Sequence, residues 1–152
     1  MGLREQFGEQ LRASMKAGDA LRTATLRMVL ARLKDIDIAA RPKGIAGVPE
    51  EEILGMLRGM VKSRRESVEL YRQGGRQDLV EKEQAEIAII ENFLPPQLEG
   101  AALVEAVTAA IAATGATGIK DMGRVMAALR AKHAATLDMA RAGAMVKARL
   151  SG

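Results

Sequence analysis

The sequence predicts an all-α protein of two domains: an N-terminal domain of long antiparallel helices and a small C-terminal domain of three helices. Apolar residues recur every three or four positions along most of the 152-residue chain, and no alternating strand pattern of useful length interrupts them. Only three residues are aromatic (Phe7, Tyr71 and Phe93), so aliphatic side chains and nine methionines must fill the core. That supply favours helix packing over a β-sandwich, which uses more aromatic and β-branched residues.

Four helices are expected before the double proline. Gly18 ends the first, and Asp19 can cap the second. A loop with two glycines and two prolines follows. Pro49 and three consecutive glutamates predict the start of the third helix, and Gly74-Gly75 predicts its left-handed end. The apolar positions that define the four helices are Leu3, Phe7, Leu11 and Met15; Leu26, Val29, Leu30, Leu33 and Ile36; Ile53, Leu57, Met60, Val61, Val68 and Tyr71; and Leu79, Ile87, Ile90 and Leu94.

The pair Pro95-Pro96 predicts both the end of the fourth helix and the border between the two domains, 1–95 and 96–152. Beyond this border the helical pattern becomes shorter and is broken by glycine. The three helices expected there cover 99–114, 121–132 and 138–150. The residues that would break or cap them are Gly115, Gly118, Asp121 and Asp138.

The excess of positive charge lies in the last third of the chain. Residues 1–99 hold 16 Lys and Arg against 16 Asp and Glu, whereas residues 100–152 hold seven against three. The difference of four equals the net charge of the whole protein, +4. Such asymmetry favours a polyanionic partner for the basic part, although surplus cations that serve only solubility give the same pattern.

The basic cluster Lys62, Arg64 and Arg65 is expected to be a solvated, self-neutralised helix face. Lys62 stands four residues before Glu66, and Arg65 stands four residues before Glu69. Opposite charges at this spacing are neighbours on a helix surface. We therefore do not predict a nucleic-acid contact in the N-terminal domain.

The sequence contains no recognisable catalytic or cofactor site. There is no cysteine, and His133 is the only histidine, so no zinc set can be completed. The glycines do not have the spacing of a phosphate-binding loop. The carboxylate pair Glu83 and Glu86 has no catalytic partner that the sequence identifies. We expect no catalytic residue, metal or cofactor, and the scarcity of aromatic residues disfavours recognition of unpaired bases by stacking.

The segment TGIKDMGR, residues 117–124, has two interpretations. A glycine turn before a helix N-terminus presents unpaired N–H groups, and Lys120 and Arg124 lie close by, so a phosphate could dock there. Alternatively, Gly118 makes an ordinary turn and Asp121 caps the helix. In that case the carboxylate competes with any anion for the same N–H groups.

Four segments resemble the GatB/YqeY-like family, whose domain also forms the tail of the B subunit of the tRNA-dependent amidotransferase. They cover 25–39, 64–98, 118–129 and the terminal VKARL, and the second, RRESVELYRQGGRQDLVEKEQAEIAIIENFLPPQL, is the most specific. The resemblance implies an N-terminal antiparallel helical domain joined to a small C-terminal helical domain. It also implies a bacterial protein and tRNA binding by the C-terminal domain. The implied contact residues are Lys120, Arg124, Lys132 and Lys147.

This chain departs from the family pattern at one point. Relatives tend to carry a glycine and a basic residue where the chain has Ala135 and Thr136. The departure puts one backbone or phosphate contact in doubt.

Three hypotheses for the function follow. The first is a non-catalytic accessory module that docks on tRNA, with no DNA partner expected. The second is an adaptor whose N-terminal helices bind an amidotransferase subunit or another translation protein, which an exposed patch at Met56 and Met60 would favour. The third is a subunit of a carbon–nitrogen ligase that uses glutamine as amido donor, which would need an ATP site or a glutaminase from another chain.

The location expected for this chain is the cytoplasm. Its N-terminus is charged and has no apolar core like that of a signal peptide. No stretch approaches the roughly 18 apolar residues of a membrane span. The absence of cysteine fits a reducing compartment.

Overall fold

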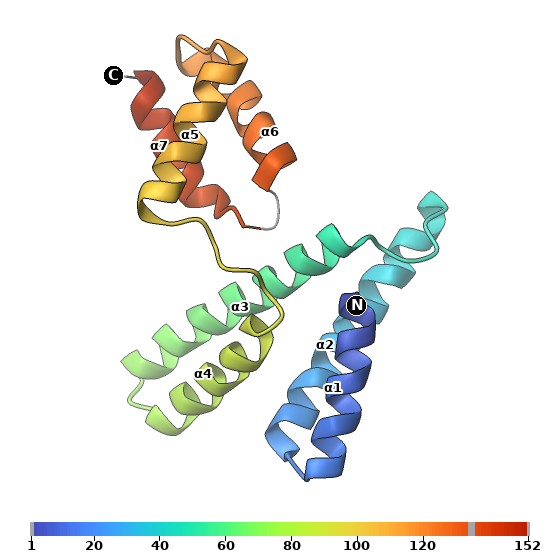
Figure 1. The fold of residues 1–152 in the computed structure, drawn as a ribbon. Helices are drawn as coiled ribbons and strands as arrows, with labels where there is room; N and C mark the ends of the chain where they lie inside the picture. Colours follow the sequence, from blue (N-terminus) through green and yellow to red (C-terminus); the bar gives the residue numbers. More distant parts are fainter. Residues whose placement is uncertain (1, 134–135, 152) are drawn as a thin grey trace. The chain divides into compact units, whose positions relative to one another are not determined.

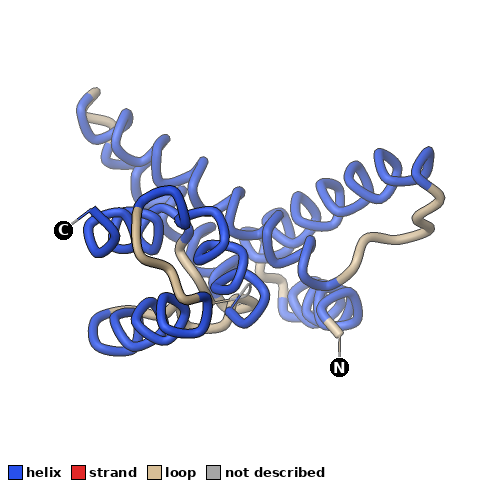
Figure 2. Tube along the Cα trace, turned by 90° about the horizontal axis from the view of Figure 1, so that it is seen from above, coloured by secondary structure: helices blue, strands red, loops and turns tan. Residues whose placement is uncertain are grey.

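The fold is all-α, as the sequence predicts. A computed structural model describes residues 2–133 and 136–151. Over those residues the chain forms seven α-helices and two short 3-10 helices, and no strand (Figure 2). It divides into two compact units, Met1–Leu94 and Pro95–Gly152, which are described separately below.

The first unit begins with a helical hairpin. Helices α1 (Leu3–Ala17) and α2 (Ala20–Ala40) pack side by side (Figure 1). Gly18 has a φ of 70°, the left-handed conformation that glycine adopts most easily, and its N–H donates to the carbonyl of Met15. The carboxylate of Asp19 accepts from the N–H of Arg22 at 3.1 Å. Both predicted caps are confirmed.

A second hairpin follows the 3-10 helix η1 (Arg41–Lys43). It consists of α3 (Glu50–Gln73) and α4 (Gln77–Glu91), with Pro49 at the start of α3 as predicted. Gly75, with a φ of 71°, makes the left-handed turn between them. Helix α4 ends at Glu91, so Leu94 lies beyond the helix and not on its face. The reason is the approaching proline, which disfavours helical backbone in the residue before it.

In the core of the first unit, the first helix packs against residues near the end of the unit. Phe7 on α1 is fully buried, and its ring meets the edge of Phe93 with 4.8 Å between the ring centroids and 80° between the planes. Such edge-to-face pairs contribute about 0.5–1.5 kcal/mol beyond the buried area. The other large side chains that are fully buried here are Leu26, Val29, Ile53, Leu57, Val80 and Ile90.

A polar latch fixes the loop before α3 against α1. The guanidinium of Arg4 donates two hydrogen bonds to Asp37, both 2.8 Å long, and a third to the carbonyl of Val48. The carboxylate of Asp37 also accepts from the N–H of Val48 at 2.9 Å. Hydrogen bonds from Arg4 and Val48 lower the pKa of Asp37 to about 2. Glu50 completes the latch by accepting from the N–H of Leu3 at 2.7 Å.

Arginines of α3 pair with carboxylates of α4. Arg64 donates to Glu86, which is buried, at 3.0 Å, and it lies 3.9 Å from Glu83. Burial raises the pKa of Glu83, and the neighbouring charge of Glu86 adds to that shift. Arg65 pairs with Glu91 at 2.8 Å.

The prediction that Lys62 and Arg65 are neutralised by glutamates of their own helix is therefore wrong. Arg65 reaches across to α4, whereas Glu69 contacts Arg72 and Gln73. No ion pair joins Lys62 to Glu66 among the described residues. The antiparallel packing of α3 against α4 offers Arg65 a carboxylate that the sequence of α3 alone does not reveal.

The second unit is a bundle of three helices. They are α5 (Gly100–Thr114), α6 (Met122–His133), preceded by the 3-10 helix η2 (Ile119–Asp121), and α7 (Met139–Ser151) (Figure 1). The carboxylate of Asp138 accepts from two N–H groups of the first turn of α7, which confirms the predicted cap. The buried core consists of Leu103, Val107, Ala110, Val125, Leu129, Leu137, Ala142 and Val146.

None of the described helices is long and apolar enough by itself to cross a membrane. Helix α5 and the η2–α6 segment satisfy that test only as a pair, and they are bent by 97° at the break between them.

Candidate nucleic-acid interface

The turn before α6 is closed by a carboxylate of the chain itself. Oδ2 of Asp121 accepts from the N–H of Thr117 at 3.0 Å and from the N–H of Gly118 at 3.3 Å. These bonds, together with Arg124, lower the pKa of Asp121 to about 2. Of the two interpretations of this segment, the structure supports the second: the N–H groups that an anion would use are taken by Asp121. Asp121 ends η2 and directly precedes α6, but its carboxylate accepts from N–H groups that lie before it in the chain and not from those of the first turn of α6.

Arg124 is held within the same cluster. Its guanidinium donates to Asp121 at 2.7 Å and to the carbonyl of Thr114, at the end of α5, at 3.0 Å. The side chain is still 60% exposed. Arg124 therefore has free N–H groups for a ligand, but Asp121 offsets its charge, and part of its role is to hold α5 against the turn.

Helix α6 presents an exposed face of small residues between two arginines. Val125 and Leu129 are buried, and at 100° per residue the opposite side carries Gly123, Ala127 and Ala131, all exposed. Arg124 lies at one edge of this strip and Arg130 at the other. We call these five positions (123, 124, 127, 130 and 131) the α6 face. Its small residues allow a bulky partner to approach the helix backbone closely.

Arg130 is the residue that sequence reasoning missed. It is exposed, and no carboxylate of the described residues lies within ion-pair distance of it. A helical projection of 121–132 would have identified it, because Arg124 and Arg130 are 120° apart on either side of the small residues.

The three predicted lysines are all exposed but are not brought to one point. Lys120 lies on η2 and Lys147 on α7, and these two elements are in contact. Lys132 lies eight residues beyond Arg124, about 12 Å along α6. The structure thus groups Lys120, Arg124 and Lys147 on neighbouring elements and leaves Lys132 at the far end of the helix.

The second unit has a larger excess of cations over carboxylates than the first. It holds seven Lys and Arg against four Asp and Glu, whereas residues 1–94 hold 16 against 15. Arg141 pairs with Glu99 and Asp138, and Arg149 donates to the hydroxyl of Thr108 at 2.7 Å. Among the described residues of this unit, five cations have no ion pair: Arg149, and four that also have no hydrogen-bond partner, Lys120, Arg130, Lys132 and Lys147.

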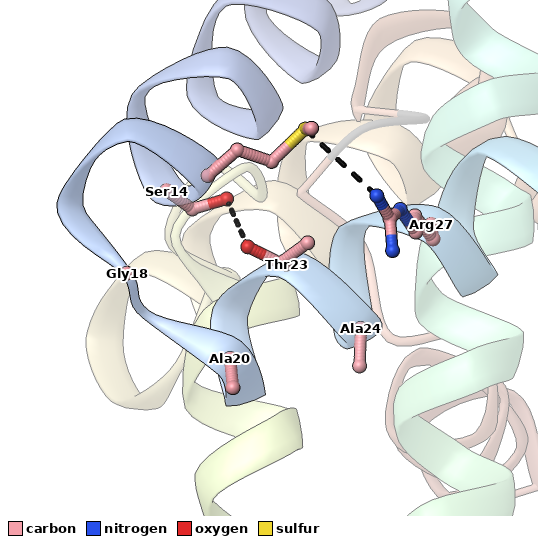
Figure 3. Close-up of a pocket in the computed structure, with 7 residues that line it drawn as sticks. Ser14, Gly18, Ala20, Thr23, Ala24 and Arg27 are labelled. Atoms are coloured by element: carbon pink, nitrogen blue, oxygen red, sulfur yellow. Dashed lines mark hydrogen bonds between the residues drawn. The ribbon is translucent and has the colours of Figure 1, made fainter.

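The first unit has a small pocket at the end of its α1–α2 hairpin. It has a volume of about 380 Å³, and Ser14, Thr23 and Arg27 are among the residues that line it (Figure 3). The hydroxyls of Ser14 and Thr23 bond to each other at 2.8 Å, and Arg27 lies 3.9 Å from the sulfur of Met15. No acid or base lies beside the hydroxyls to activate them.

In residues 2–133 and 136–151 no group of three or more His, Cys, Asp or Glu side chains could hold a metal ion. His133 is half-buried, and its carbonyl accepts from the N–H of Thr136. Ala135, the site of the departure from the family pattern, lies outside the described residues.

Comparison with known proteins identifies the family. The family model of Yqey-like proteins matches residues 4–150, nearly the whole chain. The chain belongs to the YqeY-like family. The predicted family is thereby confirmed, and with it the expectation of a helical protein of this type.

The similar proteins found for this YqeY-like chain come from yeasts. Four of them are named "Altered inheritance of mitochondria protein 41, mitochondrial". Those of Lachancea thermotolerans and Eremothecium gossypii are each 34% identical over 86 residues, which is 57% of this chain and 44% and 45% of theirs. An uncharacterized protein of Schizosaccharomyces pombe is 28% identical over 87 residues, 57% of this chain and 68% of its own length. The match to the first two thus spans less than half of each relative.

Proposed function

We propose that this YqeY-like chain is a non-catalytic helical module that associates with folded tRNA through its second unit, Pro95–Gly152. The observation that carries the proposal is the set of unpaired cations Lys120, Arg130, Lys132 and Lys147, with Arg124 as a fifth, partly engaged contact. The bacterial origin, the cytoplasmic location and an amidotransferase or other translation protein as partner belong to the same proposal.

The expected chemistry is electrostatic. Four cations that neutralise phosphates release condensed counterions, which gives a slope of about −3 to −4 for log K against log salt concentration. The second unit has no aromatic residue, so bases are not held by stacking. Contacts to phosphates and to the shape of the folded RNA remain, and they position a protein without reading a sequence.

The test is a fluorescence-anisotropy titration of a labelled tRNA transcript with the full chain at 50 and 200 mM salt. We expect Lys120→Glu combined with Arg130→Glu to weaken binding more than tenfold and to reduce the salt slope by about 2. The matched control is Lys16→Glu combined with Lys34→Glu, which changes the net charge by the same amount at exposed positions of the first unit. We expect the control to stay within about threefold of the natural chain, through its effect on the overall field.

The comparison of the two double variants distinguishes a binding site on the second unit from a general effect of net charge. Equal losses in both double variants would contradict a site on the second unit, since only the total charge would then matter. Binding of the natural chain that does not depend on salt would contradict the phosphate contacts themselves.

A further inference from the structure

The first unit contains an open groove between α2 and α3. Figure 1 shows the α1–α2 hairpin and the α3–α4 hairpin as two arms that diverge. The space between α2 and α3 measures about 870 Å³ and is lined by Met28 and Ile36 from α2 and by Met56 and Met60 from α3. We call it the α2–α3 groove. Met28 is 39% exposed, and the other three side chains are half-buried, so the apolar lining is accessible from outside.

The α3 side of the groove is free of side chains at two positions. Gly55 and Gly59, one turn apart, line the groove, and a Cβ added at either would meet no atom within 4 Å. Both lie in the interior of a long helix, where glycine is less favourable than alanine. The packing of this unit does not require them, because nothing fills the space above them. A partner could therefore approach the backbone of α3 closely here.

The charges along the groove are uneven. At one end Arg64 contacts the sulfur of Met28 at 3.7 Å, but its charge is already offset by Glu86 and Glu83. The other end carries Asp35 and Glu52, and no cation of the described residues forms an ion pair with either. Arg32, one turn before Asp35, is the remaining open charge. The uncompensated charge of the lining is thus −1, with both carboxylates toward one end.

We propose that the α2–α3 groove docks an amphipathic α-helix of a partner protein. The helix lays its apolar face on Met28, Met56 and Met60 and places a Lys or Arg beside Asp35 and Glu52. Unbranched methionines adapt to varied apolar partners, and helix-in-groove binding uses anchors at positions i, i+3 or i+4 and i+7. The stretch of α3 from Glu52 to Arg64 is about 18 Å long, which matches a helix of about 12 residues. The open carboxylates disfavour an RNA strand in this groove.

The inference is independent of the tRNA proposal, since it uses different residues in a different unit. Failure of tRNA binding would leave the groove and its lining unchanged. Conversely, a groove that binds no helix would leave the cations of the second unit in place. The two proposals are therefore tested by separate measurements, one of tRNA binding and one of peptide binding.

The test uses a displayed library of 16-residue peptides built on a helix-forming Ala/Glu/Lys frame, with the positions of one face randomised. It is selected against the full natural chain and, in parallel, against the Gly59→Leu variant. The added side chain projects into open space in the groove, and leucine favours helix over glycine, so the variant should melt no lower than the natural chain. The matched control, Ala88→Leu, places the same side chain at an exposed position of α4 outside the groove.

We expect the peptides enriched on the natural chain to carry apolar residues at i, i+4 and i+7 and a Lys or Arg at one end. They should bind Gly59→Leu at least tenfold more weakly and Ala88→Leu with unchanged affinity. Asp35→Asn with Glu52→Gln should weaken binding about fivefold and remove the preference for the terminal cation. No enrichment, equal enrichment on Gly59→Leu, or a preference for acidic peptides would each overturn the proposal.

A second measurement uses the methionines as reporters. With methyl-labelled methionine in the full natural chain, the selected peptide should shift the resonances of Met28, Met56 and Met60. Those of Met122 and Met126, which pack in the second unit, should not move. Shifts confined to the second unit would overturn the proposal. So would shifts of Met28, Met56 and Met60 produced by the tRNA transcript in place of the peptide.

Discussion

The two units of this protein use charge in different ways. In the first unit, ion pairs join helices that are distant in sequence: Arg4 reaches Asp37, and Arg64 reaches Glu86. In the second unit the shorter pairs are local, as between Arg124 and Asp121, three residues apart. The first unit thus uses ion pairs to join its helices. The second leaves five of its seven cations without an ion pair among the described residues, and all five are exposed.

This contrast shows that the number of cations does not measure the charge that a unit offers to a polyanion. Residues 1–94 contain more than twice as many cations as the second unit, 16 against seven, yet 15 carboxylates offset all but one of them. What distinguishes the second unit is the excess of its cations over its carboxylates, seven against four. The following predictions would break or sharpen this comparison, beginning with the largest expected effect.

Phe7→Ala should destabilise the first unit alone. It removes a fully buried ring and its partner contact with Phe93, which costs about 3–5 kcal/mol. Native-state hydrogen exchange should show a loss of amide protection in α1 to α4 and unchanged protection in α5 to α7. Ile119→Ala, at a side chain that is 47% exposed, serves as the control. A uniform loss of protection over both units would contradict their independence.

Loss of one ion pair from each unit should have unequal effects. Arg64→Ala leaves the buried carboxylate of Glu86 unpaired and should lower the free energy of unfolding by about 3 kcal/mol. Arg141→Ala breaks contacts between exposed groups and should cost less than about 1 kcal/mol. Urea unfolding of both variants measures the difference. Equal costs would show that ion pairs serve the two units alike.

Low pH should lower the stability of both units, through the protonation of one carboxylate in each. Asp37 and Asp121 both have a pKa of about 2 in the folded chain, below that of an unfolded Asp, which is about 3.9. Their contributions to stability are therefore present above about pH 4 and are lost as the pH falls toward 2. Glu83 acts in the opposite direction, because its raised pKa makes protonation favour the folded chain.

The pH prediction is checked by thermal unfolding between pH 6 and pH 2. In the first unit Asp37→Asn should flatten the acid dependence, and in the second unit Asp121→Asn should do the same. Each unit is followed through its own amides. A variant that keeps the full acid dependence of its unit would show that another carboxylate is responsible.

The smallest effect is expected from two helical glycines, Gly55 in the interior of α3 and Gly123 in the first turn of α6. Gly55→Ala in the first unit and Gly123→Ala in the second both place a Cβ in open space, so each should stabilise its helix by about 0.5–1 kcal/mol. Melting temperatures measure the gain. A loss of stability at either position would mean that the glycine serves the packing of its own unit.

Helix ends were predictable because their causes are local. Gly18, Asp19, Gly75 and Asp138 act through their own backbone or through N–H groups a few residues away, and the structure confirms each. The partner of Arg65 was not predictable from the sequence of its helix. Glu91 lies 26 residues away and comes close only because α4 folds back on α3.

The residues of the candidate site also fall into a predictable and an unpredictable group. Lys120, Lys132 and Lys147 were selected by residue type and by resemblance to the family, and the structure finds all three exposed. Arg130 was missed, because its exposure beside the small residues of α6 follows only from which face of that helix is buried. Met56 and Met60 were named from the sequence as residues of an exposed patch, and the structure finds them half-buried. The α2–α3 groove that they line could not be predicted, because it is made by the divergence of two hairpins.

The contact between Phe7 and Phe93 also constrains how the chain is made. The two rings are 86 residues apart in the chain, and each is the other's partner in the core. At about 5–20 residues per second, a ribosome needs about 4–17 s to add those residues. During that interval the first hairpin leaves the exit tunnel with one side of its core uncovered. A nascent chain of this protein therefore leaves the Phe7 ring without its core partner until Phe93 has been added.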